Sequence, residues 1–476
     1  MMTMPFIKEL RHWAAVRGDR TAVVVGEQRL SYAQLLQAAQ HQPKQDAGTS
    51  PVVVIELPTS VELAIKFCSA VVQRRPVMVL DTQWPDGVRR ALMGQARAWA
   101  SSRRQQPEAP ETFLLGLSSG TSGVPKAFLR PAISWHTSFL RSAEYFDVGE
   151  STLTLAPGPL AASMNLYALG ESLFSGGTFL ALPHFSPDAA LDAMVENGAS
   201  RLVLVPTILG LMAARGLATG RSGEQLSSIV CAGSEMPDTL LALVQEWAPH
   251  ARIQQYYGAA ELGFVSAVTM TGTDTAGDQG VGQAFPGAEI AIRDELGQDC
   301  APGQQGDVWV KGPYACDGYA WGDDGLAFTV EAAAEPDQRW CTVRDQGSLD
   351  ARGRLHLAGR ASDMVNVSGA NVYPHPVEQL LRSALEAAGV RAPRVIVAGI
   401  PDLIRGQRLI AACHDAGAEQ QLLDTLRRAA QHLPESHRPR AFFALSELPL
   451  TGSGKISRAL LSHWITEGDP RAQRLR

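Results

Sequence analysis

The chain has 476 residues, 45% of them hydrophobic, which is enough to bury a large core and to form two or more domains. Its 42 basic and 48 acidic residues give a net charge of −6, and no dense lysine and arginine run marks a nucleic-acid or anionic-membrane face. The six cysteines are scattered, which fits a reducing cytoplasm. The N-terminus is charged and no apolar stretch approaches ~18 residues, so we expect no membrane insertion. We therefore expect a cytoplasmic protein without nucleic-acid partners.

Compact apolar runs alternate with amphipathic segments as far as about residue 233. A β-branched run at 21–25 gives way after Ser31 to a helical pattern, and the aliphatic runs at 52–57 and 76–80 have a helical pattern between them. Further runs of this kind are FLALP at 179–183, RLVLVP at 201–206 and SSIVCAG at 227–233. The alternation predicts an α/β fold built from layered sheets.

The pattern changes twice in the second half of the chain. From about residue 280 the strands become shorter and are separated by glycine, which predicts a small β-rich subdomain. After Arg360, helices near 375–388 and 418–432 alternate with the strands RVIVAGI and AFFALSEL. We predict an N-terminal domain of residues 1–360, with the β-rich subdomain at about 280–360, and a small mobile α+β domain of residues 361–476.

A cluster of small polar residues follows an apolar run in FLLGLSSGTSGVPKAFLR at 113–130. Glycine lets successive N–H groups point inward, the hydroxyl groups add donors, and a lysine adds positive charge. These properties predict a polyphosphate cradle made of Ser118, Ser119, Gly120, Thr121, Ser122, Gly123 and Lys126. The spacing is not that of a Walker P-loop, and a polar hairpin turn is the alternative for this segment alone.

Five segments in order resemble the signatures of the adenylate-forming superfamily, which contains acyl- and aryl-CoA synthetases, peptide-synthetase adenylation domains and luciferases. They are the phosphate loop, QQYYGAAE at 254–261, WCTVRDQGSLDARGRLHLAGR at 340–360, VNVSGANVYPHPVEQLL at 365–381 and PLTGSGKISRALL at 449–461. Because all five occur in the same order, chance agreement is improbable, and the resemblance covers nearly the whole chain.

QQYYGAAE combines residue types that suit a nucleotide and its metal ion. Tyr257 offers an aromatic face to a purine, Gly258 allows close approach of the backbone, and Glu261 offers a carboxylate to Mg²⁺. Taken alone, this octapeptide is more typical of a surface turn. The resemblance implies the same three roles, makes Gln255 an adenine contact, and adds Ala259 and Ala260 to the nucleotide site and Thr121 to the metal site.

Two other segments complete the nucleotide site that the resemblance implies. Asp345 is expected to bind both ribose hydroxyls, for which the two carboxylate oxygens are suited, and Arg360 to reach the same nucleotide. In CAGSE at 231–235, Gly233 and Ser234 are expected to line the adenine and acyl pockets.

The C-terminal domain is expected to serve two half-reactions. A lone lysine near a C-terminus is normally solvated, but Lys455 in TGSGKIS resembles the residue that stabilises the adenylation transition state with Thr121 and Lys126. Rotation about a hinge at Ser362 is expected to withdraw Lys455 and to bring to the adenylate the thiol-side loop of Ser368, Gly369 and Ala370.

The implied reaction is ATP-dependent activation of a carboxylic acid to an acyl-adenylate, with release of pyrophosphate and then transfer to a thiol. The implied cofactors are ATP, Mg²⁺ and coenzyme A, and the alternative thiol is the phosphopantetheine of an acyl or aryl carrier protein.

Four residues, at three places in the chain, depart from the family pattern. Ala260 replaces the usual threonine before the metal-binding glutamate, Val343-Arg344 replaces the usual Thr-Gly before Asp345, and Ser362 replaces Asp or Lys at the hinge. These departures leave open a catalytically weakened nucleotide-binding protein. Such a protein should have lost Lys455 or Glu261, and the chain keeps both.

The segment PGPLAASMNLYALGESL at 157–173 resembles one wall of the acyl pocket. It has no acidic residue between Pro159 and Gly170 to hold an ammonium group, so an α-amino acid is disfavoured. An apolar wall with one polar group favours an aryl or medium-chain acid, although packing of a core helix would select similar residues. The expected pocket residues are Ala161, Ala162, Ser163, Met164, Asn165 and Gly258.

Overall fold

A computed structural model describes residues 4–43, 52–103, 112–118, 125–234, 236–270, 279–323, 325, 327–333, 335–360, 363–367, 370–390, 393–402, 406–414, 419–451 and 454–475. The chain forms two compact units. The first unit contains Met1–Met236, Leu243–Ala291 and Trp309–Val343, and the second contains Pro237–Ala242, Ile292–Val308 and Arg344–Arg476. The domain boundary predicted at residue 360 stays a prediction.

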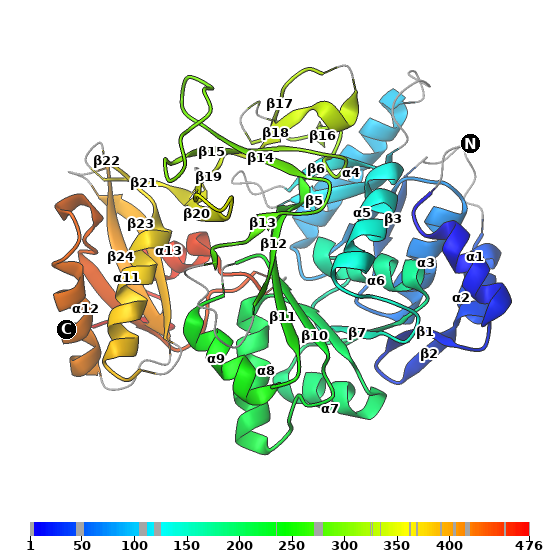
Figure 1. Cartoon of the computed structure of the whole chain (residues 1–476), viewed down its shortest axis with the longest axis horizontal. Helices are drawn as coiled ribbons and strands as arrows, with labels where there is room; N and C mark the ends of the chain where they lie inside the picture. Colours follow the sequence, from blue (N-terminus) through cyan, green and yellow to red (C-terminus); the bar gives the residue numbers. More distant parts are fainter. Residues whose placement is uncertain are drawn as a thin grey trace. The chain divides into compact units, whose positions relative to one another are not determined.

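A nine-stranded sheet forms much of the first unit, in the order β13-β12-β11-β10-β9-β7-β8-β1-β2 (Figure 1). The strands from β11 to β1 are parallel, and the two edges are antiparallel. The apolar runs at 179–183, 201–206 and 227–233 form three of the central strands. The strands are β1 (Thr21–Val25), β2 (Gln28–Ser31), β7 (Leu153–Ala156), β8 (Thr178–Ala181), β9 (Arg201–Leu204), β10 (Ser228–Ala232), β11 (Arg252–Ala259), β12 (Gly263–Met270) and β13 (Gln283–Ala284).

A five-stranded sheet in the order β16-β6-β5-β4-β3 also belongs to the first unit. Its strands are β3 (Val53–Glu56), β4 (Val77–Leu80), β5 (Thr112–Ser118), β6 (Lys126–Pro131) and β16 (Tyr319–Trp321). The pairs β3-β4 and β4-β5 are parallel, whereas β5-β6 and β6-β16 are antiparallel. The hairpin β5-β6 is therefore the point at which the sheet changes direction, and it carries the predicted phosphate loop.

Helices cover these sheets, and α6 packs on β7, β8 and β9 (Figure 1). Ser31 begins the second helix with a capping box, in which its hydroxyl accepts from the Gln34 N–H and the Gln34 side chain accepts from the Ser31 N–H. The helices are α1 (Ile7–Val16), α2 (Tyr32–His41), α3 (Val61–Val72), α4 (Asp86–Arg103), α5 (Ala132–Tyr145), α6 (Ser163–Ser175), α7 (Pro187–Asn197), α8 (Pro206–Thr219) and α9 (Asp238–Trp247), the last of which begins in the second unit.

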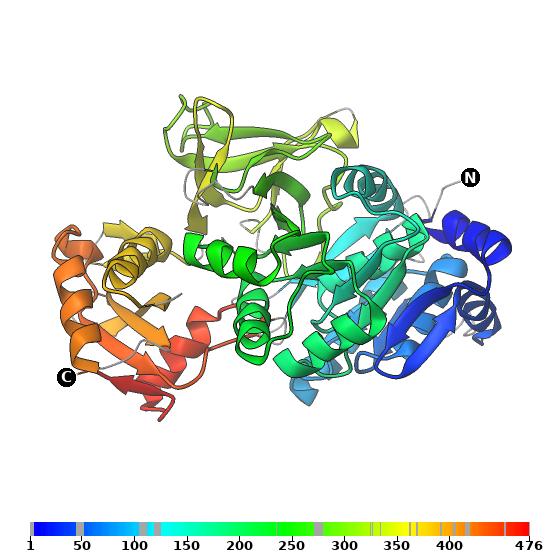
Figure 2. The same cartoon turned by 60° about the horizontal axis from the view of Figure 1, so that its bottom comes forward.

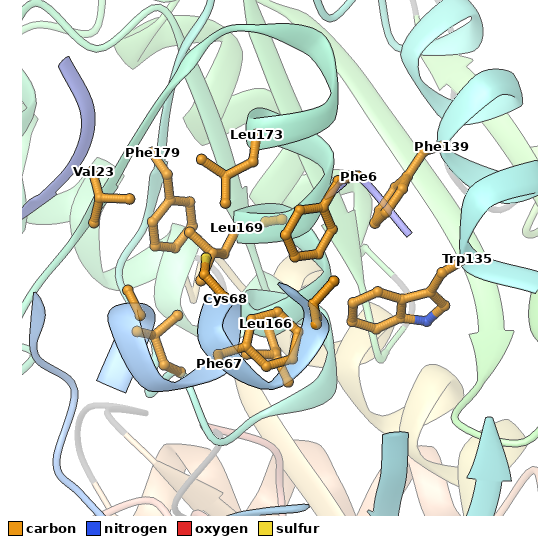
Figure 3. Packing of buried hydrophobic residues seen from close by; sticks show 14 of the residues in the cluster. Phe6, Val23, Phe67, Cys68, Trp135, Phe139, Leu166, Leu169, Leu173 and Phe179 are labelled. Carbon is orange, nitrogen blue, oxygen red and sulfur yellow. The ribbon is translucent and has the colours of Figure 1, made fainter. Parts of the chain in front are cut away.

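Aromatic and aliphatic side chains from α3, α5 and α6 form the centre of the largest core (Figure 3). The ring of Trp135 on α5 lies 6.4 Å from that of Phe67 on α3 and 5.6 Å from that of Phe139, measured between centroids. Leu166 and Leu169 of α6 are buried in the same cluster. This packing fixes α6, which carries Asn165 in its first turn.

Short strands follow in the region predicted to be β-rich. They are β14 (Glu289–Arg293), β15 (Gly306–Lys311), β17 (Thr329–Val330), β18 (Trp340–Thr342), β19 (Asp345–Leu349) and β20 (Leu355–Arg360), with the 3-10 turn η1 (Pro336–Gln338). In the first unit β15 pairs with β18, and in the second unit β15 pairs with β19, which pairs with β20. The short strands predicted for this region are present.

The second unit contains a sheet in the order β22-β21-β24-β25-β26, with β23 paired to β24. Alternate residues of its strands face opposite sides: Val395 and Val397 pack with α11 and α12, whereas Ile396 and Ala398 pack with α13. Figure 2 shows the ribbon of this sheet with these helices around it. The elements are β21 (Val365–Val367), β22 (Ala370–Val372), α11 (Pro374–Ala387), β23 (Arg394–Asp402), β24 (Gly406–His414), α12 (Glu419–Ala430), η3 (Glu435–His437), β25 (Ala441–Leu445), α13 (Arg458–Glu467) and β26 (Ala472–Arg474).

The mixed α/β architecture predicted from the sequence is confirmed. In the part of the chain that the structure describes, no helix has the length and apolarity needed to cross a membrane.

A buried ion pair lies between α6 and the start of β9. Glu171 and Arg201 are 2.7 Å apart, and their side chains are only 2% and 3% exposed. Because two charges have been removed from water here, each one depends on the other for compensation.

Replacing Glu171 with alanine should lower the free energy of unfolding by about 3–5 kcal/mol, because the Arg201 charge would remain buried without its carboxylate. Urea unfolding followed by circular dichroism measures the change. Glu150→Ala is the matched control: its pair with Arg17 is about half exposed, so a loss of ~1 kcal/mol or less is expected. Equal losses in the two variants would contradict the prediction.

A second buried carboxylate holds α11, β23 and α13 together. Glu378 accepts two hydrogen bonds from Arg458 at 2.8 and 2.9 Å and one from the Val397 N–H at 2.8 Å. Burial by itself raises the pKa of Glu378, but the Arg458 charge and the hydrogen bonds outweigh it and hold the pKa at about 2.

Glu378→Gln should therefore destabilise the protein most near neutral pH. A carboxyl whose folded pKa is lowered contributes stability above its unfolded pKa of 4.5, and that stability is lost as the pH falls toward 2. We expect a deficit of about 3 kcal/mol at pH 6 that shrinks steadily below pH 4.5, measured by urea unfolding at several pH values. The exposed Glu447→Gln is the control, and a deficit independent of pH would refute the assignment.

Candidate active site

The phosphate hairpin places the two described ends of the predicted cradle opposite each other. Ser118 at the end of β5 and Lys126 at the start of β6 are cross-strand partners. Lys126 is buried, and the Trp321 indole N–H of β16 donates to the Pro125 carbonyl oxygen at 3.3 Å. The predicted residues between them, Ser119, Gly120, Thr121, Ser122 and Gly123, lie outside the described residues.

Residues 258–262, which are the end of β11 and the turn that leads to β12, carry the predicted metal ligand. A Cβ atom on Gly258 would overlap the carbonyl oxygen of Gly263, so the chain itself requires glycine there. The Leu262 N–H donates to the Ala259 carbonyl at 3.1 Å, and the Cys316 N–H donates to the Glu261 carbonyl at 2.7 Å. The turn is thus held from within and by the segment before β16, and the Glu261 side chain is buried.

Arg130 holds this turn from the opposite sheet. Its guanidinium, buried on β6, donates to the carbonyl oxygens of Ala260 and Tyr314 and lies 5.3 Å from the Phe128 ring. Burial lowers the pKa of Arg130, while the charges of nearby groups that include Glu261 raise it. Arg130 is the last residue of the segment 113–130, but the sequence analysis gave it no role; the available signal was an arginine directly after the apolar run AFL.

Tyr319 on β16 is the second residue that the motifs missed. Its hydroxyl donates to Glu261 Oε1 at 2.8 Å, and Lys126 Nζ lies 5.6 Å from its ring centroid. Burial and the neighbouring Glu261 carboxylate raise the pKa of Tyr319, so the phenol stays protonated and acts as a donor. The predicted metal ligand and the predicted phosphate-binding lysine are therefore joined through one aromatic side chain.

The predicted adenine contacts lie together at the ends of β10 and β11. Gln255 Nε2 donates to the Ser234 carbonyl oxygen at 3.1 Å, and Gly233 has a φ of +92°, a conformation that favours glycine. Gln255 Oε1 is buried and has no hydrogen-bond partner among the described residues. An acceptor left in this state fits the exocyclic amino group of adenine. Tyr257 is largely buried beside it on β11.

The second unit contains the other residues that were predicted to contact the nucleotide. Asp345 on β19 and Arg360 on β20 are direct cross-strand partners. Their contact with a nucleotide stays a prediction. Lys455 is exposed in a turn closed by hydrogen bonds of 2.7 and 3.1 Å with Thr451. Ala370 begins β22, and the predicted Ser362, Ser368 and Gly369 lie outside the described residues.

The predicted acyl wall begins at the N-terminus of α6. Ala162 is the N-cap of the helix, which starts at Ser163, so the predicted pocket residues Ala161 and Ala162 precede the helix. Asn165 Nδ2 donates to the Pro159 carbonyl oxygen at 3.0 Å, which fixes the orientation of the amide. Asn165 Oδ1 is buried and has no hydrogen-bond partner among the described residues. The wall residues Ala161, Ser163 and Met164 are partly exposed.

The described residues contain no cluster of three or more side chains of the kind that would hold a metal ion by themselves. Mg²⁺ commonly keeps several waters and binds one or two carboxylates together with the phosphates of a nucleotide. A single buried carboxylate, Glu261, close to the phosphate hairpin fits Mg²⁺ that enters with ATP.

Comparison with known proteins gives consistent matches. The family described as "AMP-binding enzyme" matches residues 45–320. The uncharacterized acyl-CoA ligase YhfT of Bacillus subtilis is 31% identical over 76% of this chain and 70% of its own length. Indoleacetate-CoA ligase of Aromatoleum aromaticum is 28% identical over 74% of this chain and 66% of its own length. The fold matches o-succinylbenzoate CoA synthetase of Bacillus subtilis in complex with its acyl-adenylate, with a TM-score of 0.76 and 23% identity over 97% of this chain and 98% of that chain.

Arg344, directly before Asp345, has a φ of +59°, in the left-handed region that favours glycine. Arg344→Gly should therefore give a higher free energy of unfolding than Arg344→Ala by about 1 kcal/mol, since both remove the guanidinium and only glycine relieves the backbone. Urea unfolding of both variants measures the difference. Equal stability, or a more stable alanine variant, would show that the backbone at residue 344 is not strained.

Proposed function

The chain belongs to the AMP-binding enzyme family, and we propose that it is an ATP-dependent ligase that joins an aryl or medium-chain carboxylic acid bearing a hydroxyl or amino substituent to coenzyme A. The proposal places the nucleotide phosphates at the β5-β6 hairpin, the adenine beside Gln255, and the acid beside the N-terminal turn of α6.

The contact between Tyr319 and Glu261 carries the proposal. It puts a buried carboxylate 2.8 Å from a phenol whose ring lies under the ammonium group of Lys126. A polyphosphate with a divalent cation needs both a carboxylate for the cation and a positive charge for the phosphate oxygens. The arrangement provides both, and a purely structural role would not explain a lysine and a glutamate that are both buried at a hairpin predicted to bind phosphate.

In the proposed first half-reaction, an oxygen of the substrate carboxylate attacks the α-phosphorus of ATP while the bond to the pyrophosphate oxygen breaks. Lys126 offsets negative charge on the phosphate oxygens, and Glu261 holds the cation that accompanies them. Bound Mg²⁺ supplies further charge neutralisation. Lys455 is proposed to stabilise the same transition state from the second unit. No protein nucleophile is required, because the substrate carboxylate is itself the nucleophile.

In the proposed second half-reaction, the sulfur of the thiol attacks the carbonyl carbon of the acyl-adenylate and AMP leaves. Coenzyme A is favoured as the thiol because the relatives named above are CoA ligases. The phosphopantetheine of a carrier protein presents the same sulfur and is an outcome of the test.

The Asn165 side chain is the reason for proposing a hydroxyl or amino substituent on the acid. Its amide nitrogen is committed to the Pro159 carbonyl, so a ligand would meet the carbonyl oxygen Oδ1, which only accepts hydrogen bonds. A hydroxyl or amino group on the substrate would satisfy this buried acceptor, whereas an unsubstituted acid would leave it unpaired. Indoleacetate, named for one relative, is an aromatic acid with a ring N–H.

We expect acid-dependent release of pyrophosphate from ATP in the presence of Mg²⁺. The release should be about 100-fold slower in Lys455→Ala, because an electrostatic contact to the transition state is lost.

A panel of acids tests the substituent: it pairs benzoate with its 2-amino and 2-hydroxy derivatives and octanoate with a hydroxyoctanoate. Substituted acids should react about tenfold better, measured as kcat/KM, and Asn165→Leu should remove that preference.

Addition of coenzyme A should then yield AMP and a thioester. Pyrophosphate release without transfer to coenzyme A would replace coenzyme A by a carrier protein in the proposal. If the protein binds ATP but no acid in the panel causes pyrophosphate release, a nucleotide-binding protein without ligase activity is favoured. If unsubstituted acids react as well as substituted ones, the role given to Asn165 is wrong.

A further inference from the structure

Tyr319 belongs to none of the five motifs on which the proposed function was built, yet it contacts both sides of the phosphate site. It lies in GPYACDGYAW, on the short edge strand β16. Pairing of β16 with β6 places Tyr319 opposite Phe128, two residues after Lys126. The position of its ring is therefore set by backbone pairing with the strand that carries the lysine.

Two interactions converge on the Tyr319 side chain. Its hydroxyl donates to Glu261 Oε1 at 2.8 Å, and Lys126 Nζ lies 5.6 Å from the ring centroid. An ammonium group within about 6 Å of an aromatic ring is attracted to its face. One residue thus contacts the first residue of β6 and the carboxylate proposed to bind the cation.

The phenol constrains the carboxylate more than an apolar neighbour would. A hydroxyl has one proton to donate, and donating it to Oε1 fixes the rotation of the carboxylate about its terminal bond. The backbone of the same turn is held separately, by Arg130 at Ala260 and by the Cys316 N–H at Glu261. The backbone contacts set where Glu261 lies, and Tyr319 sets how its carboxylate is turned.

We propose that Tyr319 is a positioning residue that presents Glu261 Oε2 to Mg²⁺ and couples binding of the cation to the phosphate hairpin. This inference rests on the proposed function, because it takes Glu261 as the ligand of Mg²⁺ that accompanies ATP. It assigns to Tyr319 no contact with the reacting atoms.

The test is Tyr319→Phe, which keeps the ring under Lys126 and removes the hydroxyl. Isothermal titration calorimetry measures ATP binding, without any acid substrate, over a series of Mg²⁺ concentrations and in EDTA. We expect the Mg²⁺ concentration that gives half of the maximal enhancement of ATP affinity to rise about tenfold, since a hydrogen bond to a charged group is lost. ATP binding in EDTA should stay within about twofold of that of the unmodified protein.

Tyr314→Phe is the matched control. It removes a tyrosine hydroxyl five residues away that donates to the Pro286 backbone carbonyl and not to Glu261. Its Mg²⁺ dependence should be unchanged, and thermal unfolding of both variants shows whether each retains the fold. A Mg²⁺ shift of equal size in Tyr314→Phe would overturn the proposal, because general loosening of this segment would then explain both.

A double-mutant cycle with Glu261→Ala separates orientation from packing. If Tyr319 acts through Glu261, Tyr319→Phe should have no further effect on the Mg²⁺ dependence once Glu261 is alanine. Additive effects would overturn the proposal. If the unmodified protein binds Mg²⁺ and ATP together but Tyr319→Phe behaves identically, this inference fails and the proposed function stands; if the unmodified protein binds no ATP, both fail.

Discussion

The buried guanidinium of Arg130 joins the two sheets of the first unit where the proposed site forms. It extends from β6 of the five-stranded sheet to the carbonyl oxygen of Ala260, in the turn that links two strands of the nine-stranded sheet. A second hydrogen bond reaches the Tyr314 carbonyl, in the segment that leads to β16. Burying a charge is costly unless it is paired and hydrogen-bonded, and here the compensation comes from two carbonyls and the nearby Glu261 carboxylate. The placement of Glu261 therefore depends on a residue of the phosphate hairpin, 131 positions earlier in the chain.

The hydrogen bond from Arg130 bears on the replacement of the usual threonine by Ala260. The family pattern has a threonine at this position, and its replacement was one of the departures that left open a catalytically weakened protein. The structure shows the backbone of Ala260 bound by Arg130 and the next side chain, Glu261, bound by Tyr319. A turn that is fixed through its carbonyl and through its carboxylate does not need a hydroxyl to be rigid, since neither contact involves the side chain at position 260. The substitution is thus compatible with a site whose geometry is set in advance of ligand binding, which is the condition for electrostatic stabilisation of a transition state.

Local patterns predicted the elements of the fold, whereas contacts between distant segments could not be predicted from one sequence. The aliphatic runs at 76–80 and 201–206 are buried on both faces, as strands in a covered parallel sheet must be, and they were recognised for that reason. Arg130 and Tyr319 were missed because their partners become visible only when β16 is known to pair with β6 and when the 258–262 turn is known to face that pair. Arg344 is an intermediate case: the sequence showed that it stands where the family pattern has glycine, and the structure adds that it adopts a positive φ, which favours glycine.

In the second unit, Arg458 anchors the helix that follows the Lys455 turn. Leu450 and Ile456 are bridged across the lysine turn, and α13 begins only three residues after Lys455. From the first turn of that helix Arg458 binds Glu378 on α11 and Asp363, which lies next to the predicted hinge residue Ser362. The lysine turn, α11 and the hinge-side segment are therefore connected through one guanidinium. If the residues after Ser362 rotate as the resemblance implies, these parts must move together. Withdrawal of Lys455 and arrival of the loop that ends at Ala370 are then two consequences of a single rigid-body motion, because β22 leads directly into α11.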